Sequence, residues 1–260
     1  MKADLHNHLG TNGANPGFDE TIDLVHNKLG HYSMFGIVNS DDSRYERFVE
    51  QRGKYDRQII DGGKAVYVPK RGVLVVKCQE MFTKEGHILA IATPYGKNVK
   101  TKDAKDAIKE AKDLGGILSA VHPYYREGIG NFLESNPELI EEFSSWEIYN
   151  GSAEFSFPLV LPRNSNKKSA EFYFNSILKN SRLNIGVSSF TDGHEVNVVG
   201  RCYTHLEIDG DFYSKDFVER LDNALRKVKT WDRLHTRPNK TDAAIHTFNM
   251  VVATLKGLRK

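Results

Sequence analysis

Short apolar runs rich in β-branched residues recur along the chain, and helical patterns lie between several of them. A chain in which strands alternate with helices forms an α/β fold, because helices cover the faces of the sheet. The alternation predicts a mostly parallel sheet, and seven or eight strands within residues 1–210 fit a small barrel better than a doubly wound sheet. The predicted strands are Ala3–Leu5, Met34–Val38, Val73–Val76, Ile88–Ile91, Ile117–Val121, Trp146–Tyr149, Ile185–Ser189 and Tyr203–Ile208.

The clearest helical pattern lies within residues 101–116, TKDAKDAIKEAKDLGG. Thr101 is the expected N-cap, and Gly115 is expected to end the helix. The residues expected to form its apolar face are Ala104, Ile108, Ala111 and Leu114.

The composition is that of an ordinary soluble protein, with 39% hydrophobic and 27% charged residues among 260. The chain has two cysteines, Cys78 and Cys202, which favours a reducing compartment over a disulfide framework. No apolar segment has the length needed to cross a bilayer, and MKADLHNH lacks the apolar run of a signal peptide. We therefore expect a cytoplasmic protein with no membrane partner.

Residues 211–260 are predicted to form a helical extension packed on the domain of residues 1–210. Two helical patterns, 218–234 and 242–258, flank a turn at Pro238. The extension carries 11 Lys/Arg and 6 Asp/Glu, a net charge of +5 (11 − 6). Such an excess is most often a solvated helix face, and a nucleic-acid clamp that includes Trp231 is the alternative. Phe248, Val251 and Leu255 form a stripe that suits either the core or contact with a second copy or a partner protein.

The stretch ADLHNHLGT places His6 and His8 two residues apart at the end of an apolar run. Residues i and i+2 of a strand point to the same side of it. Imidazole is the commonest protein ligand of metal ions, so the pair can form half of a metal site. Histidines with no role at the surface are the alternative.

Other residues with metal-binding side chains stand at the ends of the predicted strands. Ligands bind parallel α/β sheets at the carboxyl ends of the strands, so these side chains are expected to converge. Convergence of so many of them favours a metal site. They are Asp41 and Asp42 in FGIVNSDD, Glu80 in VLVVKCQE, His122 in SAVHPY, and Asp192 and His194 in SSFTDGH.

Together these motifs resemble those of the PHP (polymerase and histidinol phosphatase) family. The resemblance rests on DLHNH, on the glutamate of KCQEMFTKEGH, and on GHILAI, VHPY and TDGH, which occur in the family's order within residues 1–200. It implies a distorted seven-stranded α/β barrel that binds two or three divalent ions (zinc, manganese or iron) and hydrolyses phosphate esters. Residues 1–210 would then be the hydrolase domain.

The resemblance also implies a role for each ligand. His6, His8 and Asp192 are expected at the first metal, and His87 and His122 at the second. Glu80 is expected to bridge these two metals, and His194 to bind a third. Glu147 matches a recurrent acidic position that is expected to support the ligands rather than bind metal.

Two positions depart from the family pattern, and both belong to the third metal site. Where the family usually has an aspartate or histidine shortly after its first motif, this chain has LGTNGAN, with Asn12 nearest. Where the family has Thr-Asp-His, this chain has NSDDS, so that Asp41 or Asp42 replaces the histidine. An oxygen-rich third site would favour Mn²⁺ or Mg²⁺ over zinc, or the site would stay empty.

The implied chemistry is hydrolysis by a metal-bound water bridged near Glu80, with Arg126 and Arg44 as candidates for binding phosphoryl oxygens. The substrate would be a phosphorylated small molecule, such as a nucleotide or sugar phosphate, or a nucleic-acid end. Two alternatives stay open. One is a nuclease that uses the basic extension as a clamp, and the other is a structural domain that has lost catalysis.

Overall fold

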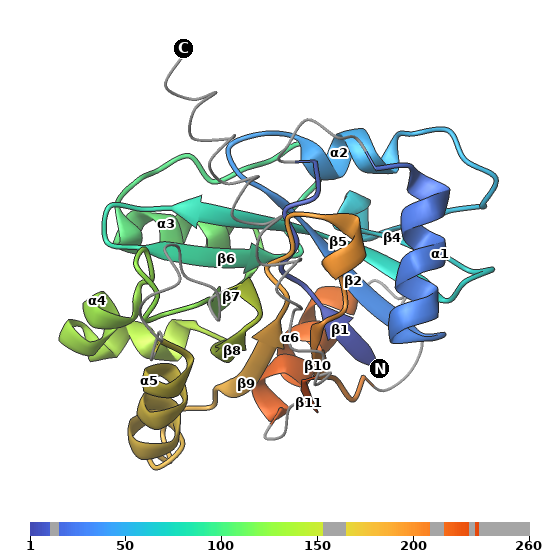
Figure 1. Cartoon of the computed structure of the whole chain (residues 1–260). Helices are drawn as coiled ribbons and strands as arrows, with labels where there is room; N and C mark the ends of the chain where they lie inside the picture. Colours follow the sequence, from blue (N-terminus) through green and yellow to red (C-terminus); the bar gives the residue numbers. More distant parts are fainter. Residues whose placement is uncertain (11–15, 153–164, 209–215, 229–231, 234–260) are drawn as a thin grey trace.

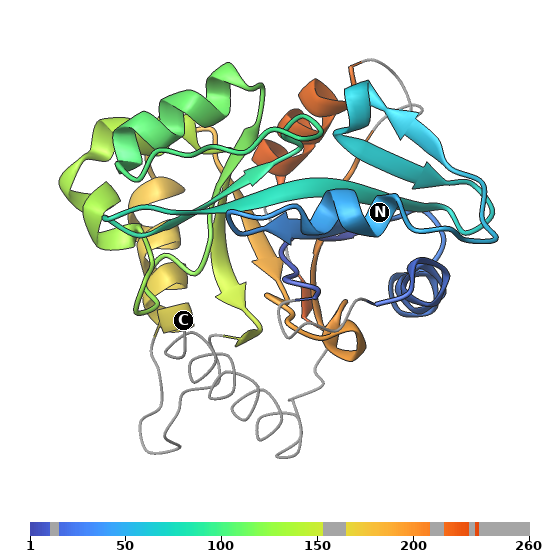
Figure 2. The ribbon, with the colours of Figure 1, turned by 90° about the horizontal axis from the view of Figure 1, so that it is seen from above.

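One strongly curved sheet of eleven strands organises the chain (Figure 1). The computed structural model describes residues 1–10, 16–152, 165–208, 216–228 and 232–233. The sheet forms a nearly closed barrel, and the helices lie around its outside (Figure 2). The predicted α/β class and distorted barrel are confirmed. No helix among the described residues is long and apolar enough to cross a membrane.

Eight strands follow the predicted apolar runs closely, and three are additional. Two of these, β3 (Gln58–Ile60) and β4 (Ala65–Val68), pair with each other, and β4 also pairs with β5; the third is β11 (Asp232–Arg233). The eight predicted strands are β1 (Lys2–Asp4), β2 (Ser33–Asn39), β5 (Val73–Phe82), β6 (His87–Ile91), β7 (Ile117–Ala120), β8 (Ser145–Asn150), β9 (Gly186–Phe190) and β10 (Cys202–His205).

The prediction of a mostly parallel sheet is wrong. β1–β2, β2–β5, β7–β8 and β8–β9 are parallel, whereas the other six strand pairs described are antiparallel. The physical reason lies in β5 and β6. β5 continues to Phe82, and only four residues separate it from β6, so the chain returns as a hairpin rather than through a crossover helix.

Side chains rather than a strand ladder bring the two ends of the sheet together. β10 pairs with β1 near one end, and β9 is the last strand at the other end. The Thr204 hydroxyl of β10 accepts a hydrogen bond from the Ser189 N–H (3.0 Å) and donates to the Ser189 carbonyl (3.2 Å). The Thr191 hydroxyl, just after β9, likewise accepts from the Cys202 N–H (3.1 Å) and donates to the Cys202 carbonyl (3.2 Å), so two buried threonines close the barrel.

The helices pack on the sheet through apolar faces. Their bounds are α1 (Phe18–Leu29), α2 (Arg44–Val49), α3 (Ala104–Asp113), α4 (Gly130–Ser135), α5 (Ser165–Phe172) and α6 (Phe217–Lys227). Three-residue to six-residue 3₁₀ turns occur at Asp61–Gly63, Pro137–Glu142 and Val196–Val198, and a π turn at Tyr173–Ile177 continues α5.

The predicted helix in residues 101–116 is confirmed, but its expected N-cap, Thr101, is wrong. Asp103 caps α3 instead, because its carboxylate accepts hydrogen bonds from the Lys105 and Asp106 N–H groups. Gly115 follows the helix with φ of +70°, a conformation that favours glycine.

Two apolar clusters form the core. Phe18, Ile22 and Val25 lie on one face of α1 and pack with Phe35 of β2 and Val75 of β5. The larger cluster includes Trp146, Phe190 and Leu221, so it spans β8, β9 and α6. Both faces of the central strands are therefore buried.

The described part of the predicted C-terminal extension packs on the barrel. α6 ends at Lys227, and the Val187 N–H of β9 donates to the Val228 carbonyl. The prediction of a helix over 218–234 is wrong in its last part, since Asp232 and Arg233 pair with β10. The expected turn at Pro238, Trp231 and the helix over 242–258 lie outside the described residues, and the domain boundary at 210 stays a prediction.

Gly36 of β2 sets the approach of the chain segment that carries His6. A Cβ atom at Gly36 would lie 2.2 Å from the Leu5 carbonyl oxygen, so the backbone would have to shift. We expect Gly36→Ala to lower the free energy of unfolding by about 1–3 kcal/mol, the usual cost of overpacking, as measured by urea denaturation. Gly17→Ala is the control, because its Cβ would meet only the flexible end of Glu20. Equal losses in both variants would contradict this account.

Candidate metal centre

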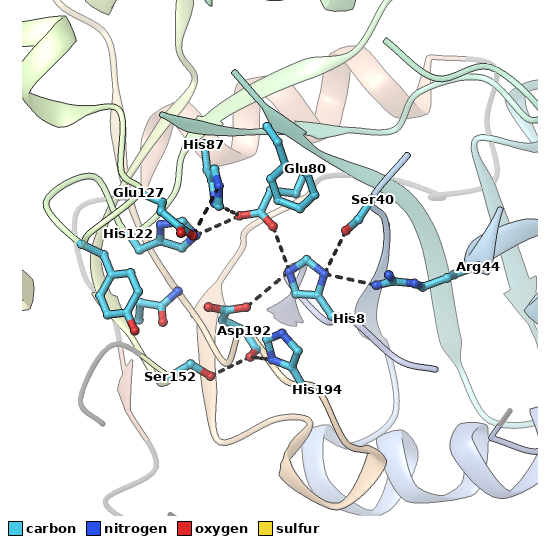
Figure 3. A pocket seen from close by; sticks show the side chains of 13 residues that line it. His8, Ser40, Arg44, Glu80, His87, His122, Glu127, Ser152, Asp192 and His194 are labelled. Atoms are coloured by element: carbon cyan, nitrogen blue, oxygen red, sulfur yellow. Dashed lines mark hydrogen bonds and ion pairs between the residues drawn. The ribbon is translucent and has the colours of Figure 1, made fainter. Parts of the chain in front are cut away.

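Seven of the predicted ligands converge at one end of the barrel, and all of them except His6 line the pocket shown in Figure 3. Their donor atoms form four overlapping groups, and within each group the atoms lie within 4.8 Å of one another. Strand ends supply most of them, as the sequence predicts, although Glu80 lies within β5. The seven are His6 and His8 after β1, Glu80 in β5, His87 at the start of β6, His122 after β7, and Asp192 and His194 after β9.

The first group joins the two N-terminal histidines to both carboxylates. His6 and His8 lie just beyond β1, in a segment that pairs with Gly193 through Asn7, and their Nε2 atoms are 3.0 Å apart. His8 Nε2 is 3.1 Å from Glu80 Oε2 and 3.4 Å from Asp192 Oδ1. His6 Nε2 is 3.6 Å from the same Asp192 oxygen.

The second group lies on the other side of Glu80. Glu80 Oε1 is 2.9 Å from His122 Nε2 and 3.0 Å from His87 Nδ1. His87 turns its Nε2 toward Glu127, with 3.6 Å between this nitrogen and Oε2. The two oxygens of Glu80 thus face two different sets of imidazoles, which is the arrangement expected of a bridging carboxylate.

The third group consists of His8, Asp192 and His194. The His194 ring stacks on the His8 ring with 4.8 Å between centroids. His194 Nδ1 is hydrogen-bonded to the Asp192 carbonyl (3.1 Å), so this nitrogen carries the proton and Nε2 is the one left to bind a metal.

The spacing of these donors fits divalent metal ions. Ligands at about 2.1 Å from one ion lie about 3.0–3.4 Å from each other in octahedral or tetrahedral geometry. The nitrogen and oxygen atoms of the first two groups lie 2.9–3.7 Å apart. Two imidazole nitrogens that both act as metal ligands carry no proton, so at 3.0 Å they cannot share a hydrogen bond and their lone pairs repel each other. A metal ion between them removes this repulsion.

Comparison with solved structures identifies the fold. A two-domain protein from Bacteroides vulgatus ATCC 8482, described as containing a predicted PHP-like metal-dependent phosphoesterase, matches 86% of this chain with a TM-score of 0.53 and 17% identity. The chain has the PHP fold. The resemblance inferred from the motifs is therefore confirmed for the fold.

Two further structures share the PHP fold with this chain. The lesion-specific endonuclease PfuEndoQ from Pyrococcus furiosus matches 90% of the chain with a TM-score of 0.57 and 16% identity. PsfC from Pseudomonas syringae PB-5123 matches 98% with a TM-score of 0.58 and 12% identity. The chain spans 63% of the length of the first structure and 57% of the second, but 98% of PsfC. No protein-family model and no curated protein matches the sequence.

Burial and charge act differently on the histidines of this PHP fold. Burial lowers the pKa of His6 to about 3, despite the nearby charges of Asp192 and Glu80, so its ring is neutral at pH 7. Burial also opposes charge on His122, but the hydrogen bond to Glu80 outweighs it and raises the pKa of His122 to about 9. Without metal, His122 therefore carries a proton at pH 7.

This difference predicts proton release when the second group binds metal. His122 is protonated below pH 9 in the metal-free protein, and a ligand must give up that proton. We expect about one proton released per chain at pH 7, and an affinity for Mn²⁺ that rises about tenfold per pH unit toward pH 9. Calorimetric titrations with Mn²⁺ in two buffers of different ionisation enthalpy measure the number of protons released on binding. His122→Gln should release one proton fewer, and equal release from both proteins would contradict the prediction.

Asp41 and Asp42 do not join the cluster. Asp41 has φ of +58° and pairs with Lys102 (2.6 Å between Oδ2 and Nζ), half-exposed at the surface. Asp42 pairs with Arg44, with 2.6 Å between Oδ2 and Nε. Neither aspartate belongs to any of the four groups found among the described residues, so the structure does not bring the predicted oxygen ligands of the third site to it. Asn12 lies outside the described residues.

The two arginines predicted to bind phosphate differ in position. Arg44 lines the pocket and points at His8, with 3.5 Å between Nη1 and Nδ1 (Figure 3). Arg126 is exposed on the loop after His122 and does not line the described pocket. The pocket holds about 350 Å³, a size suited to a small ligand. Its lining residues that the sequence did not single out are Ser40, Phe82, Tyr125, Glu127, Asn150 and Ser152.

Two buried carboxylates, those of Asp4 and Glu147, hold the segments that carry the ligands through hydrogen bonds to the backbone. Asp4 accepts hydrogen bonds from the N–H groups of Thr191 (3.0 Å) and Gly200 (2.8 Å), and so fixes both ends of the loop that carries Asp192. Burial raises the pKa of Asp4 to about 6. Glu147 accepts from the His122 N–H, which suits the supporting role predicted for it. The sequence feature that could have indicated the role of Asp4 is the presence of a charged residue inside an apolar run.

Proposed function

We propose that the protein hydrolyses phosphate esters with a centre of divalent metal ions held by its seven converging side chains. The observation that carries the proposal is the position of Glu80. Its oxygens face two sets of imidazoles at 2.9–3.1 Å, at the bottom of a pocket that also receives Arg44. Paired divalent ions, when bound, polarise phosphoryl oxygens and lower the pKa of water, which is the chemistry of two-metal hydrolases.

Side chains of the protein would hold the metal ions in place and bind the phosphoryl group. Glu80 and Asp192 hold the imidazoles in place and supply negative charge that retains the cations. The Arg44 guanidinium is held by Asp42 through Nε and lies beside His8 in the pocket, so it is placed to bind phosphoryl oxygens there. Burial of the ligands keeps bulk water from competing with the substrate for these charges.

The substrate class we favour is a phosphorylated small molecule, because the described pocket is small. A nuclease is the second candidate, supported by the likeness of the fold to an endonuclease that is described as lesion-specific. The basic extension that would clamp nucleic acid lies mostly outside the described residues. A structural domain without catalysis is disfavoured, since retention of so many buried ionisable groups without metal would be costly.

The test is metal-dependent turnover by the wild type and by His8→Ala. Protein loaded with Mn²⁺ or Zn²⁺ is assayed on p-nitrophenyl phosphate, bis-p-nitrophenyl phosphate and a 5′-labelled oligonucleotide. We expect turnover to fall about 100-fold in His8→Ala, because the first group loses one of its nitrogen ligands. The exposed His205 supplies the control variant His205→Ala, which should keep wild-type turnover.

The preferred substrate separates the two candidates. Faster hydrolysis of the monoester supports a phosphatase, and cleavage of the oligonucleotide supports a nuclease. A protein that binds neither Mn²⁺ nor Zn²⁺ and hydrolyses none of the three substrates would overturn the proposal in favour of a structural domain.

A further inference from the structure

The arginine beside His8 bears on how many ions the centre holds. Sequence motifs leave a third metal site open, and the four donor groups include one suited to it, made of His8, Asp192 and His194. Whether that group can fill depends on which of its donors are still available once the first two groups have bound metal.

His8 cannot serve the first and third groups together. A neutral imidazole offers one lone pair, because its other nitrogen carries a proton. His8 Nε2 is 3.0 Å from His6 Nε2 and 3.1 Å from Glu80 Oε2, so its lone pair belongs to the first group. His8 Nδ1 then carries the proton and donates it to Ser40 Oγ at 3.3 Å, so Arg44 Nη1, itself a donor at 3.5 Å from the same nitrogen, makes no hydrogen bond to His8 when the first group holds metal.

A third ion is therefore left with two side chains among the described residues, Asp192 and His194. Catalytic metal sites normally have three protein ligands. Asp41, the expected additional ligand, points away and pairs with Lys102. With His8 committed to the first group, the third group keeps two protein donors, so it would hold an ion weakly and a nearby positive charge is enough to keep it empty.

A fixed positive charge stands at the same place. The Arg44 side chain is 13% exposed, and its Nη1 lies 3.5 Å from His8 Nδ1, in the pocket that His194 also lines. Guanidinium stays protonated at any working pH, and Asp42 restrains it through Nε at 2.6 Å. A cation in the third group would be repelled by Arg44 at short range.

We infer that the centre binds two ions and that Arg44 supplies the third positive charge to the substrate. The inference rests on the proposed function for the role of that charge, but the number of ions can be measured without turnover. Arg44 and a third ion exclude each other, so removal of the arginine charge opens the third group.

The experiment is equilibrium dialysis against Mn²⁺ followed by elemental analysis of the full chain. We expect two ions per chain in the wild type and three in Arg44→Gln, which removes the charge and keeps much of the shape. The double variant Arg44→Gln/His194→Ala should return to two. Arg47→Gln is the matched control, because this exposed arginine of the same helix also pairs with Asp42, at 3.7 Å. It should stay at two.

Three ions in the wild type, or two in a folded Arg44→Gln, would overturn the inference and leave the proposed hydrolysis standing. A wild type that binds two ions but hydrolyses no phosphate ester would overturn the proposed function instead. Circular dichroism of each variant shows that it is folded.

Discussion

Glu80→Gln is expected to lower turnover of a phosphate ester by about 1,000-fold or more and to remove at least one ion. Glu80 contacts imidazoles of both the first and the second group, at 3.1 Å from His8 and 2.9 Å from His122. A neutral amide binds metal weakly and cannot bridge two cations. Loss of about 4 kcal/mol of transition-state stabilisation corresponds to that factor.

The measurements are kcat on p-nitrophenyl phosphate and ions per chain by elemental analysis. Glu80→Asp should recover part of both, because it keeps a carboxylate at shorter reach. Glu20→Gln, an exposed glutamate of α1, should match the wild type in both measurements. Two ions and wild-type kcat in Glu80→Gln would show that the carboxylate is not a bridge.

The convergence of the ligands could be predicted because it follows from the ends of strands. Each of His6, His122 and Asp192 comes directly after an apolar run, and such runs set the position of a side chain along the barrel axis. The convergence of these side chains can therefore be predicted without knowing which side chains contact one another. For that reason seven expected ligands meet in the structure even though several strand directions were predicted wrongly.

What the sequence did not predict depends on local geometry. The NSDDS loop places Asp41 at φ of +58°, which turns its side chain outward, and Arg44 enters the pocket from the next turn of chain. A one-residue change in such a loop redirects every following side chain. The same holds for closure of the barrel, which depends on the hydroxyls of Thr204 and Thr191 meeting the backbone of the facing strand.

Asp4 was missed, and the contact made by Glu147 could not be named, for another reason. Asp4 and Glu147 act through backbone N–H groups of distant loops, and only the folded chain shows which N–H groups face them. A charged residue in an apolar run indicates a buried partner without naming it. Metal ligands can be recognised in the sequence by their residue type, whereas the groups that orient them cannot.

Lys77→Ala is expected to cost about 3–5 kcal/mol of the free energy of unfolding, the usual loss when one partner of a buried ion pair is removed. Lys77 of β5 is fully buried, and its Nζ lies 3.3 Å from Glu46 Oε1 and 2.7 Å from the Pro94 carbonyl, to which it donates. The variant leaves the buried Glu46 carboxylate without its cation and one strand of the barrel with a cavity.

The pH dependence of this loss has a definite sign. Burial acts to raise the pKa of Glu46, but the Asn39 hydrogen bond and the Lys77 charge lower it below its usual value. Removal of Lys77 raises that pKa again. The unpaired carboxylate is then protonated more readily than in the wild type, so the difference in stability between variant and wild type should shrink as the pH falls from 7 to about 4, the ordinary titration range of a glutamate.

Urea denaturation at both pH values measures the effect, and Lys64→Ala is the control. Lys64 pairs with Asp61 at 2.9 Å near the surface, and loss of such a pair costs about 1 kcal/mol or less. Glu46 also accepts a hydrogen bond from Asn39 (2.9 Å), the residue before the loop that carries Arg44, so Lys77→Ala should loosen the pocket wall as well. An equal, small loss in both lysine variants would mean that the buried pair contributes little to the barrel.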